Sequence, residues 1–197
     1  MYMKLLRRTL FFALLFAMIP ACGGLRFSQV APGIGEFHPE KICVLPVDTG
    51  AYADVTEGVD NLIADAVRKR GCFSSVISPG DMKKLMEDND NLKHTVTGYL
   101  EKLKKVNFSD SDMSRYIGET CDADALLVVG VDFWNYTTQG KDKLAKVGFG
   151  MDLVEAQTGK IMWRVKHYDT TGYKWFKPDL ADLAEKIAGE MISHMPH

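Results

Sequence analysis

Cys22 is the residue whose type and place most clearly suggest chemistry. It follows Pro20 and Ala21, at the end of an apolar stretch that begins at Leu10. A cysteine in this place could be half of a disulfide, a metal ligand or the attachment point of a lipid. The other three cysteines, at positions 43, 72 and 121, have no C-x-x-C spacing, so the sequence indicates no metal site of the zinc type.

The residues before Cys22 have the layout of a secretory signal peptide. Three cations precede the apolar stretch, and no acidic residue occurs before Glu36. The stretch is too short to span a bilayer core of ~30 Å comfortably, because a spanning helix takes about 20 residues. The pattern predicts a signal peptide over residues 1–21. An ordinary N-terminal membrane anchor is the alternative.

The sequence Ile19-Pro20-Ala21-Cys22 resembles the lipobox of bacterial lipoproteins. In that family the cysteine thiol receives a diacylglyceryl group, the signal is cut before it, and the new amino terminus is acylated with a fatty acid such as palmitate. One chain holds a protein weakly, at ~0.8 kcal/mol per buried methylene, whereas several chains hold it firmly. Because residue 23 is Gly rather than Asp, the resemblance implies the inner leaflet of the outer membrane, facing the periplasm. The inner membrane is the alternative.

Composition restricts the partners of the mature chain. Residues 1–21 hold three cations and no acid, so the remaining 176 residues carry 21 cations and 26 acids, a formal charge of −5. No basic stripe remains, which argues against a nucleic acid as partner. The Gly- and Pro-rich segment 22–40 is predicted to be a lipidated flexible tether. Its apolar residues could instead dock onto a surface: Leu25, Phe27, Val30, Ile34 and Phe37.

From Lys41 onward, the apolar periodicity predicts alternating strands and helices. The short apolar strand KICVLPV opens the domain, and a helix follows with Asp54 as its N-cap and Glu57 as the capping-box partner. A second strand, CFSSVIS, leads to a helix that starts at Ser78-Pro79. Further helical segments precede the next strand: 92–103 and a short stretch capped by Ser109 with Asp112.

Three strands and a helix complete the predicted domain. CDADALLVVGVDFWNY is apolar at most positions of its first half, which indicates a strand buried on both faces. Turns at Gln139-Gly140 and 157–160 make the last three strands an antiparallel meander, and Pro178 opens the final helix. The order β-α-β-α-α-β-β-β-α predicts an α/β fold with a single mixed sheet, in one periplasmic domain over 41–197. Deep burial is expected for Val128, Val131 and Leu153.

Three segments carry a family resemblance: KICVLP, CDADALLVVGV and VGFGMDLVEAQTGKIMWR. In this order, over residues 41–195, they resemble a group of periplasmic lipoproteins. The group includes the curli-secretion lipoprotein, the activator lipoproteins of penicillin-binding proteins and the Pel-polysaccharide export lipoprotein. The resemblance implies a fold like the N-terminal domain of the Tol-Pal β-propeller protein. It does not imply one function, because this fold carries several.

The sequence indicates no catalytic, metal or cofactor site. Asp122 and Asp124 precede a buried strand, and we interpret them as caps at its start; a pair of catalytic carboxylates is the alternative. The G-F-G sequence at 148–150 indicates a bulge or a close approach of chains rather than a phosphate loop. Cys72 and Cys121 could form a disulfide in an oxidising compartment. We expect the three cysteines of the mature domain to be free thiols.

The segment Tyr173, Lys174, Trp175, Phe176 and Lys177 is the predicted partner- or membrane-facing site, because rings and cations alternate there between two elements. The alternative is that Trp175 folds over the sheet edge. The sequence favours a non-catalytic, lipid-anchored accessory or scaffold protein of an envelope assembly or export system. A regulatory module that activates a cell-wall synthase and an envelope hydrolase are the alternatives. The predicted partners are the membrane and unidentified envelope proteins, with a homo-oligomer left open.

Overall fold

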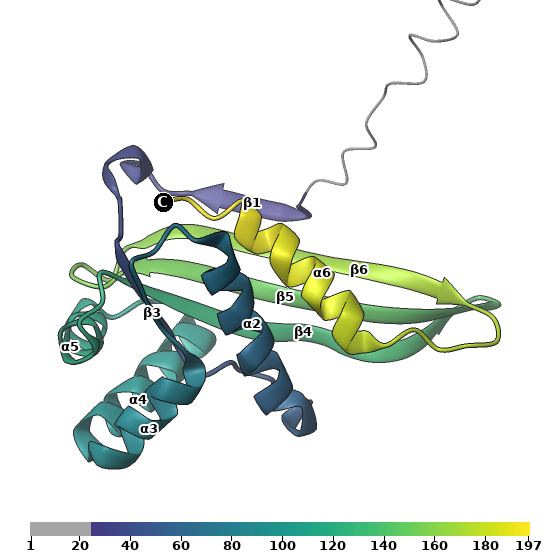
Figure 1. The fold of residues 1–197 in the computed structure, drawn as a ribbon, viewed down its shortest axis with the longest axis horizontal. Helices are drawn as coiled ribbons and strands as arrows, with labels where there is room; N and C mark the ends of the chain where they lie inside the picture. The colour runs from purple at the N-terminus through teal and green to yellow at the C-terminus, as the bar shows by residue number, and fades with distance from the viewer. Residues whose placement is uncertain (1–24) are drawn as a thin grey trace, which may run out of the picture.

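Six strands form one mixed sheet in the computed structural model, which describes residues 25–197 (Figure 1). Their order across the sheet is β1-β6-β5-β4-β2-β3. β2 pairs in parallel with β3 and β4, while β4, β5 and β6 form the predicted antiparallel meander. The predicted α/β fold with a single mixed sheet is confirmed. The strands are β1 (Phe27–Val30), β2 (Lys41–Val44), β3 (Ser75–Ile77), β4 (Ala125–Gln139), β5 (Asp142–Glu155) and β6 (Ile161–Tyr173).

Helices cover the two faces of the sheet unequally. α2 (Thr56–Arg70) and α6 (Leu180–Ser193) pack side by side over one face and enclose the larger apolar core. The helices α3 (Pro79–Asp88), α4 (Asp90–Val106) and α5 (Ser111–Cys121) cover the other face at one end only, over a smaller core. Two short 3₁₀ turns, Ile34–Glu36 and Ala53–Val55, complete the described elements.

The start of α3 agrees with the sequence prediction, whereas the starts of α2 and α5 differ from it. α2 begins at Thr56 without a side-chain cap, so the predicted Asp54 cap is wrong; a 3₁₀ turn occupies 53–55 instead. At α3 the Ser78 capping box is present, with Asp81 as its partner. Asp110 rather than Ser109 caps α5. Three separate helices therefore lie between β3 and β4, where the predicted order counted two.

The predicted tether contains a strand. β1 pairs antiparallel with β6, with Phe27 opposite Lys166, and the indole N–H of Trp163 donates to Ser28 Oγ at 3.2 Å. Phe37 is buried in the larger core. The described part of 22–40 is therefore docked rather than free. The physical reason is the outer edge of β6, whose unpaired N–H and C=O groups accept another strand. Cys22 and the signal peptide lie outside the described residues.

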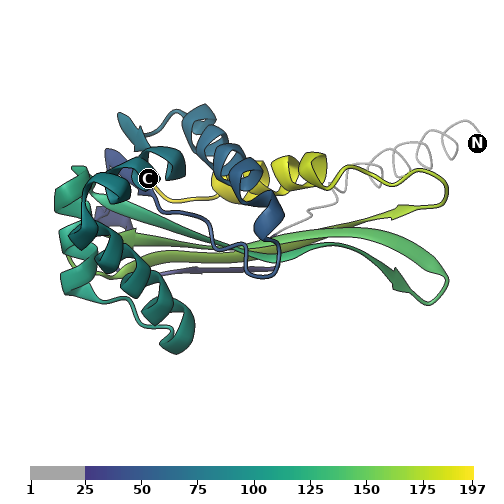
Figure 2. The same cartoon turned by 90° about the horizontal axis from the view of Figure 1, so that it is seen from below.

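The strands β4, β5 and β6 continue beyond the helical layers as a three-stranded arm (Figure 2). We call the face under α2 and α6 the helical face, and the part of the opposite face beyond α4 the open face. A register shift between Val131 and Phe133 bends β4 where the arm starts. Leu153 is fully buried as predicted, whereas Val128 and Val131 are only half-buried, because one borders the open face and the other lies at this shift.

Candidate functional site

The acidic residues that precede β4 hold the strands in place. Asp124 Oδ2 accepts hydrogen bonds from the backbone N–H groups of Glu40 and Lys41, at 3.0 and 2.9 Å. Asp122 ends α5 in a left-handed conformation and pairs with Lys41 Nζ at 2.6 Å, which raises the pKa of that amine. Both carboxylates are therefore bound structurally, as the sequence predicted, but they hold the start of the neighbouring strand β2 rather than that of β4.

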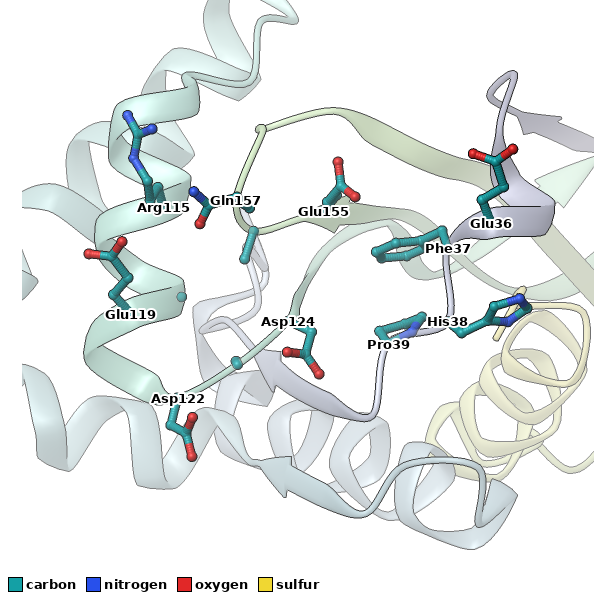
Figure 3. Close-up of a pocket in the computed structure, with 13 residues that line it drawn as sticks. Glu36, Phe37, His38, Pro39, Arg115, Glu119, Asp122, Asp124, Glu155 and Gln157 are labelled. Carbon is teal, nitrogen blue, oxygen red and sulfur yellow. The ribbon is translucent and has the colours of Figure 1, made fainter.

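These residues line a polar hollow of about 460 Å³ at the base of the sheet (Figure 3). Arg115 and Glu119 enter it from α5, Glu155 from the end of β5, and Phe37 lies across from them. Its carboxylates come from separate elements. Among residues 25–197, no group of three His, Cys, Asp or Glu side chains could hold a metal ion. Asp122 and Asp124 are bound to residues 40 and 41, and Arg115 pairs with Asp112 of its own helix.

The three cysteines of the described chain are free thiols, as predicted. Cys43 and Cys121 are buried, and both sulfurs contact Met82 Sδ, at 3.8 and 3.5 Å. A hydrogen bond with Cys121, together with burial, raises the pKa of the Cys43 thiol well above its ordinary value. Cys72 lies apart from them at the end of α2, and the Cys72–Cys121 disulfide that the sequence left open is not formed.

The predicted aromatic segment lies at the tip of the arm. Trp175 and Phe176 are each 90% exposed, so the alternative in which Trp175 covers the sheet edge does not hold. Lys174 and Lys177 are exposed beside them, and Tyr173 is half-buried as the last residue of β6. We call this group the arm tip. The arm tip therefore exposes aromatic rings and lysine side chains together on the surface.

Tyr136 of β4 supports the arm tip, and the sequence analysis did not assign it there. Its ring packs edge-to-face on Tyr173 at 5.8 Å, and its hydroxyl donates to the carbonyl oxygen of Pro178 at 2.8 Å. Lys177 Nζ lies 4.6 Å from the centre of the same ring. Little in the sequence indicated this contact, because Tyr136 and Pro178 are 42 residues apart and the fold of the meander brings them together.

A second aromatic cluster lies on the open face. Phe133 and Tyr168 pack edge-to-face at 5.5 Å across Gly148. Lys146 Nζ lies 3.3 Å from the Phe133 ring centre, and Arg26 lies 4.2 Å from that of Tyr168. The close approach that G-F-G indicated is therefore present on β5.

No family model and no curated protein matches the sequence. Solved structures match in fold. Two structures of the PelC dodecamer from Paraburkholderia phytofirmans share 14% and 15% identity, with TM-scores of 0.54 and 0.53. They cover 86% and 85% of this chain and 96% and 93% of theirs. The hypothetical protein CT253 from Chlamydia trachomatis shares 7% identity, with a TM-score of 0.55, and the match covers 78% of this chain and 93% of that chain.

These likenesses establish the fold. They confirm the predicted resemblance, in architecture, to the lipoprotein group that includes the Pel-export lipoprotein. Within residues 25–197, no helix is long and apolar enough to cross a bilayer.

Proposed function

We propose that this chain is a lipid-anchored, non-catalytic accessory or scaffold protein of a bacterial envelope assembly or export system. A lipid on Cys22 anchors it in the inner leaflet of the outer membrane. The observation that carries the proposal is the arm tip, whose Trp175 and Phe176 rings are almost fully in water. Exposed rings beside lysines suit the headgroup region of a membrane, where the rings meet acyl chains and the cations meet phosphates.

The direction of β1 supports a membrane-facing arm tip. β1 is antiparallel to β6 and begins opposite Lys166, so the amino-terminal end of β1 points toward the arm tip. Cys22 lies five residues before Phe27, a length that reaches at most about 18 Å. The seven steps of β6 from Lys166 to Tyr173 rise about 23 Å. The two lengths differ by about 5 Å, which the acyl chains on Cys22 can cover, so the lipid and the arm tip can enter the same membrane surface.

A homo-oligomer forms part of the proposal. PelC forms a dodecamer, and the shared fold makes a similar assembly of this chain a reasonable expectation. Repetition of one anchor and one arm tip around a ring would multiply weak membrane contacts, because linked binding events reinforce one another.

The membrane contact can be measured with Trp175 itself. Mature protein is reconstituted through its own lipid into phosphatidylglycerol-containing vesicles whose acyl chains carry bromine, a short-range quencher of indole fluorescence. We expect quenching in the native protein and its loss in Trp175→Phe, because the other two indoles lie within the fold. Trp134→Phe is the matched control and should leave the quenching intact. Equal quenching of native and Trp175→Phe protein would refute the membrane contact.

The anchor is tested separately. Cys22→Ala should leave the precursor uncut and without lipid, and mass spectrometry of the native protein should find a triacylated amino terminus at residue 22. A mature amino terminus elsewhere, without lipid, would refute this part of the proposal.

A further inference from the structure

The open face exposes rings that no described element covers. Figure 2 shows α3, α4 and α5 gathered at the base of the sheet, and no helix below the arm. Phe27 is 44% exposed and lies opposite Lys166, while Phe133 and Tyr168 are half-buried. Contiguous exposed rings mark an interaction surface, and aromatic residues and Arg are enriched in protein interfaces.

The open face is also positively charged. Arg26, Lys146 and Lys166 carry its cations, and none of them forms an ion pair within residues 25–197. Arg164 is neutralised by a two-point contact with Asp152, at 2.6 and 2.7 Å. Beside the three cations, Asp132 is exposed near Gly150, so a net positive charge remains.

The outer side of α6, on the opposite side of the sheet, is acidic. Asp182 and Glu185 lie one turn apart, both exposed, and neither forms an ion pair in the described chain. They line a groove of about 700 Å³ between α2 and α6, together with Asp65 and small residues, although Lys69 and Arg70 make its far end basic. The two sides of the molecule thus carry opposite charge near the arm.

The opposite charges lie at nearly the same height along the arm. Lys186 Nζ bonds Asp169 Oδ2 at 3.1 Å, which places this turn of α6 beside residue 169 of β6. In the β5–β6 register, Lys146 lies opposite Thr170, one residue further on. One residue of strand is about 3.3 Å. If two copies lie side by side with their arms parallel, the cations of one open face can therefore meet the acids of the neighbouring α6 with almost no displacement along the arm.

We propose that the open face of one copy is covered by the α6 side of a second copy. The parallel alignment of the arms rests on the proposed function, since all arm tips then face one membrane. The contact joins two different surfaces, so it is heterologous, and repetition by rotation closes it into a ring. The neighbour's Asp182 and Glu185 compensate Lys146 and Lys166, and its helix packs against the rings of the open face.

Charge reversal tests the interface in the lipidated mature protein, extracted in detergent and weighed by light scattering. Reversal of the open face (Lys146→Glu with Lys166→Glu) should dissociate the native oligomer, with at least a tenfold rise in dissociation constant. Reversal of α6 (Asp182→Lys with Glu185→Lys) should do the same. Lys93→Glu, an exposed site on α4, is the control and should leave the mass unchanged.

A mixing experiment guards against variants that simply misfold. The two reversed proteins are each monomeric alone, but when mixed they should form an alternating oligomer of native mass. One chain with all four changes should also assemble. The inference is overturned if native protein is monomeric, if either reversal leaves the mass unchanged, or if the mixture yields only dimers, which indicates a face-to-face contact. Quenching of Trp175 in brominated vesicles should persist in the monomeric variants, so failure of the interface and failure of the membrane contact remain distinguishable.

Discussion

Gly148 and Gly150 lie two residues apart on the same face of β5, but an added methyl group would meet different surroundings. At Gly148 the new Cβ would lie 2.6 Å from Tyr168 Cβ and 3.0 Å from Phe133 Cδ2. At Gly150 its nearest neighbour would be Lys166 Cε at 3.6 Å, an ordinary contact. Substitution by Ala should therefore change the free energy of unfolding in opposite directions at the two positions.

The expected magnitudes follow from two effects. Ala in place of Gly in a strand stabilises by roughly 0.5–1 kcal/mol, because the unfolded chain loses conformational freedom. At Gly148 the overlap with Tyr168 is with Cβ, which cannot rotate away, so the neighbouring strand or the ring pair must move. Such overpacking costs typically 1–3 kcal/mol. We expect Gly148→Ala to destabilise by about 1–2 kcal/mol and Gly150→Ala to stabilise by up to about 1 kcal/mol.

Urea unfolding of the mature protein, followed by circular dichroism, measures both variants. With a slope of ~2 kcal/mol/M, the midpoint of Gly148→Ala should fall by roughly 0.5–1 M and that of Gly150→Ala should stay or rise. The slope should not change, since the two variants fold to the same sheet. Equal effects at the two sites, or a stabilised Gly148→Ala, would show that the ring pair does not press on Gly148 and would refute the reasoning.

Three further predictions concern buried groups. Burial raises the pKa of Tyr99 to about 12, above the ~10 of the unfolded chain. The free energy of unfolding should therefore be constant below pH ~10 and fall by roughly 2–3 kcal/mol as the pH rises to ~12. In Tyr99→Phe this fall should be smaller. Lys83→Met removes the cation that pairs with Asp60, a residue that is only 4% exposed. The free energy of unfolding, measured in a urea melt, should fall by about 1–3 kcal/mol. Lys84→Met is the control and should change it little. Quantitative thiol labelling of denatured, unreduced mature protein should find three free thiols, and a count of one would contradict the packing around Met82.

The elements that the sequence predicted are those with an apolar face of their own. α2 shows the helical period at Val59, Ile63 and Val67, and all three are buried against the sheet. The meander was predictable for a similar reason, since its strands are apolar or alternating and two turn sequences separate them. The register shift between Val131 and Phe133 was not predicted. The spacing of apolar residues and the residue types at turns are local features. They can therefore be recognised in the sequence without knowledge of the rest of the fold.

β1 was not predictable in this way. Its four residues are all exposed, and its sequence, FSQV, has no sustained apolar face. It is a strand because β6 offers an unpaired edge and Trp163 offers a hydrogen bond to Ser28. The segment is therefore a strand because of contacts with residues more than 130 positions away in the sequence. The arm tip shows the complementary case, since the lack of a period around Trp175 correctly indicated exposure.

From the sequence, the proposed interaction site could be narrowed only to the arm tip, because the open face depends on where α4 ends relative to the sheet. β4, β5 and β6 have 15, 14 and 13 residues, against a common length of about 5–6 for strands. The apolar core needs only the halves that α2 to α6 cover. The outer halves, with the arm tip that follows β6, keep Phe133, Tyr168 and Trp175 at or near the surface. This arrangement costs solubility unless a membrane or another chain covers the rings. The polar hollow offers no such unexplained feature, because Asp122 and Asp124 are already bound to the start of β2. The arm, rather than the hollow, is therefore the place where loss of function without loss of fold should be sought.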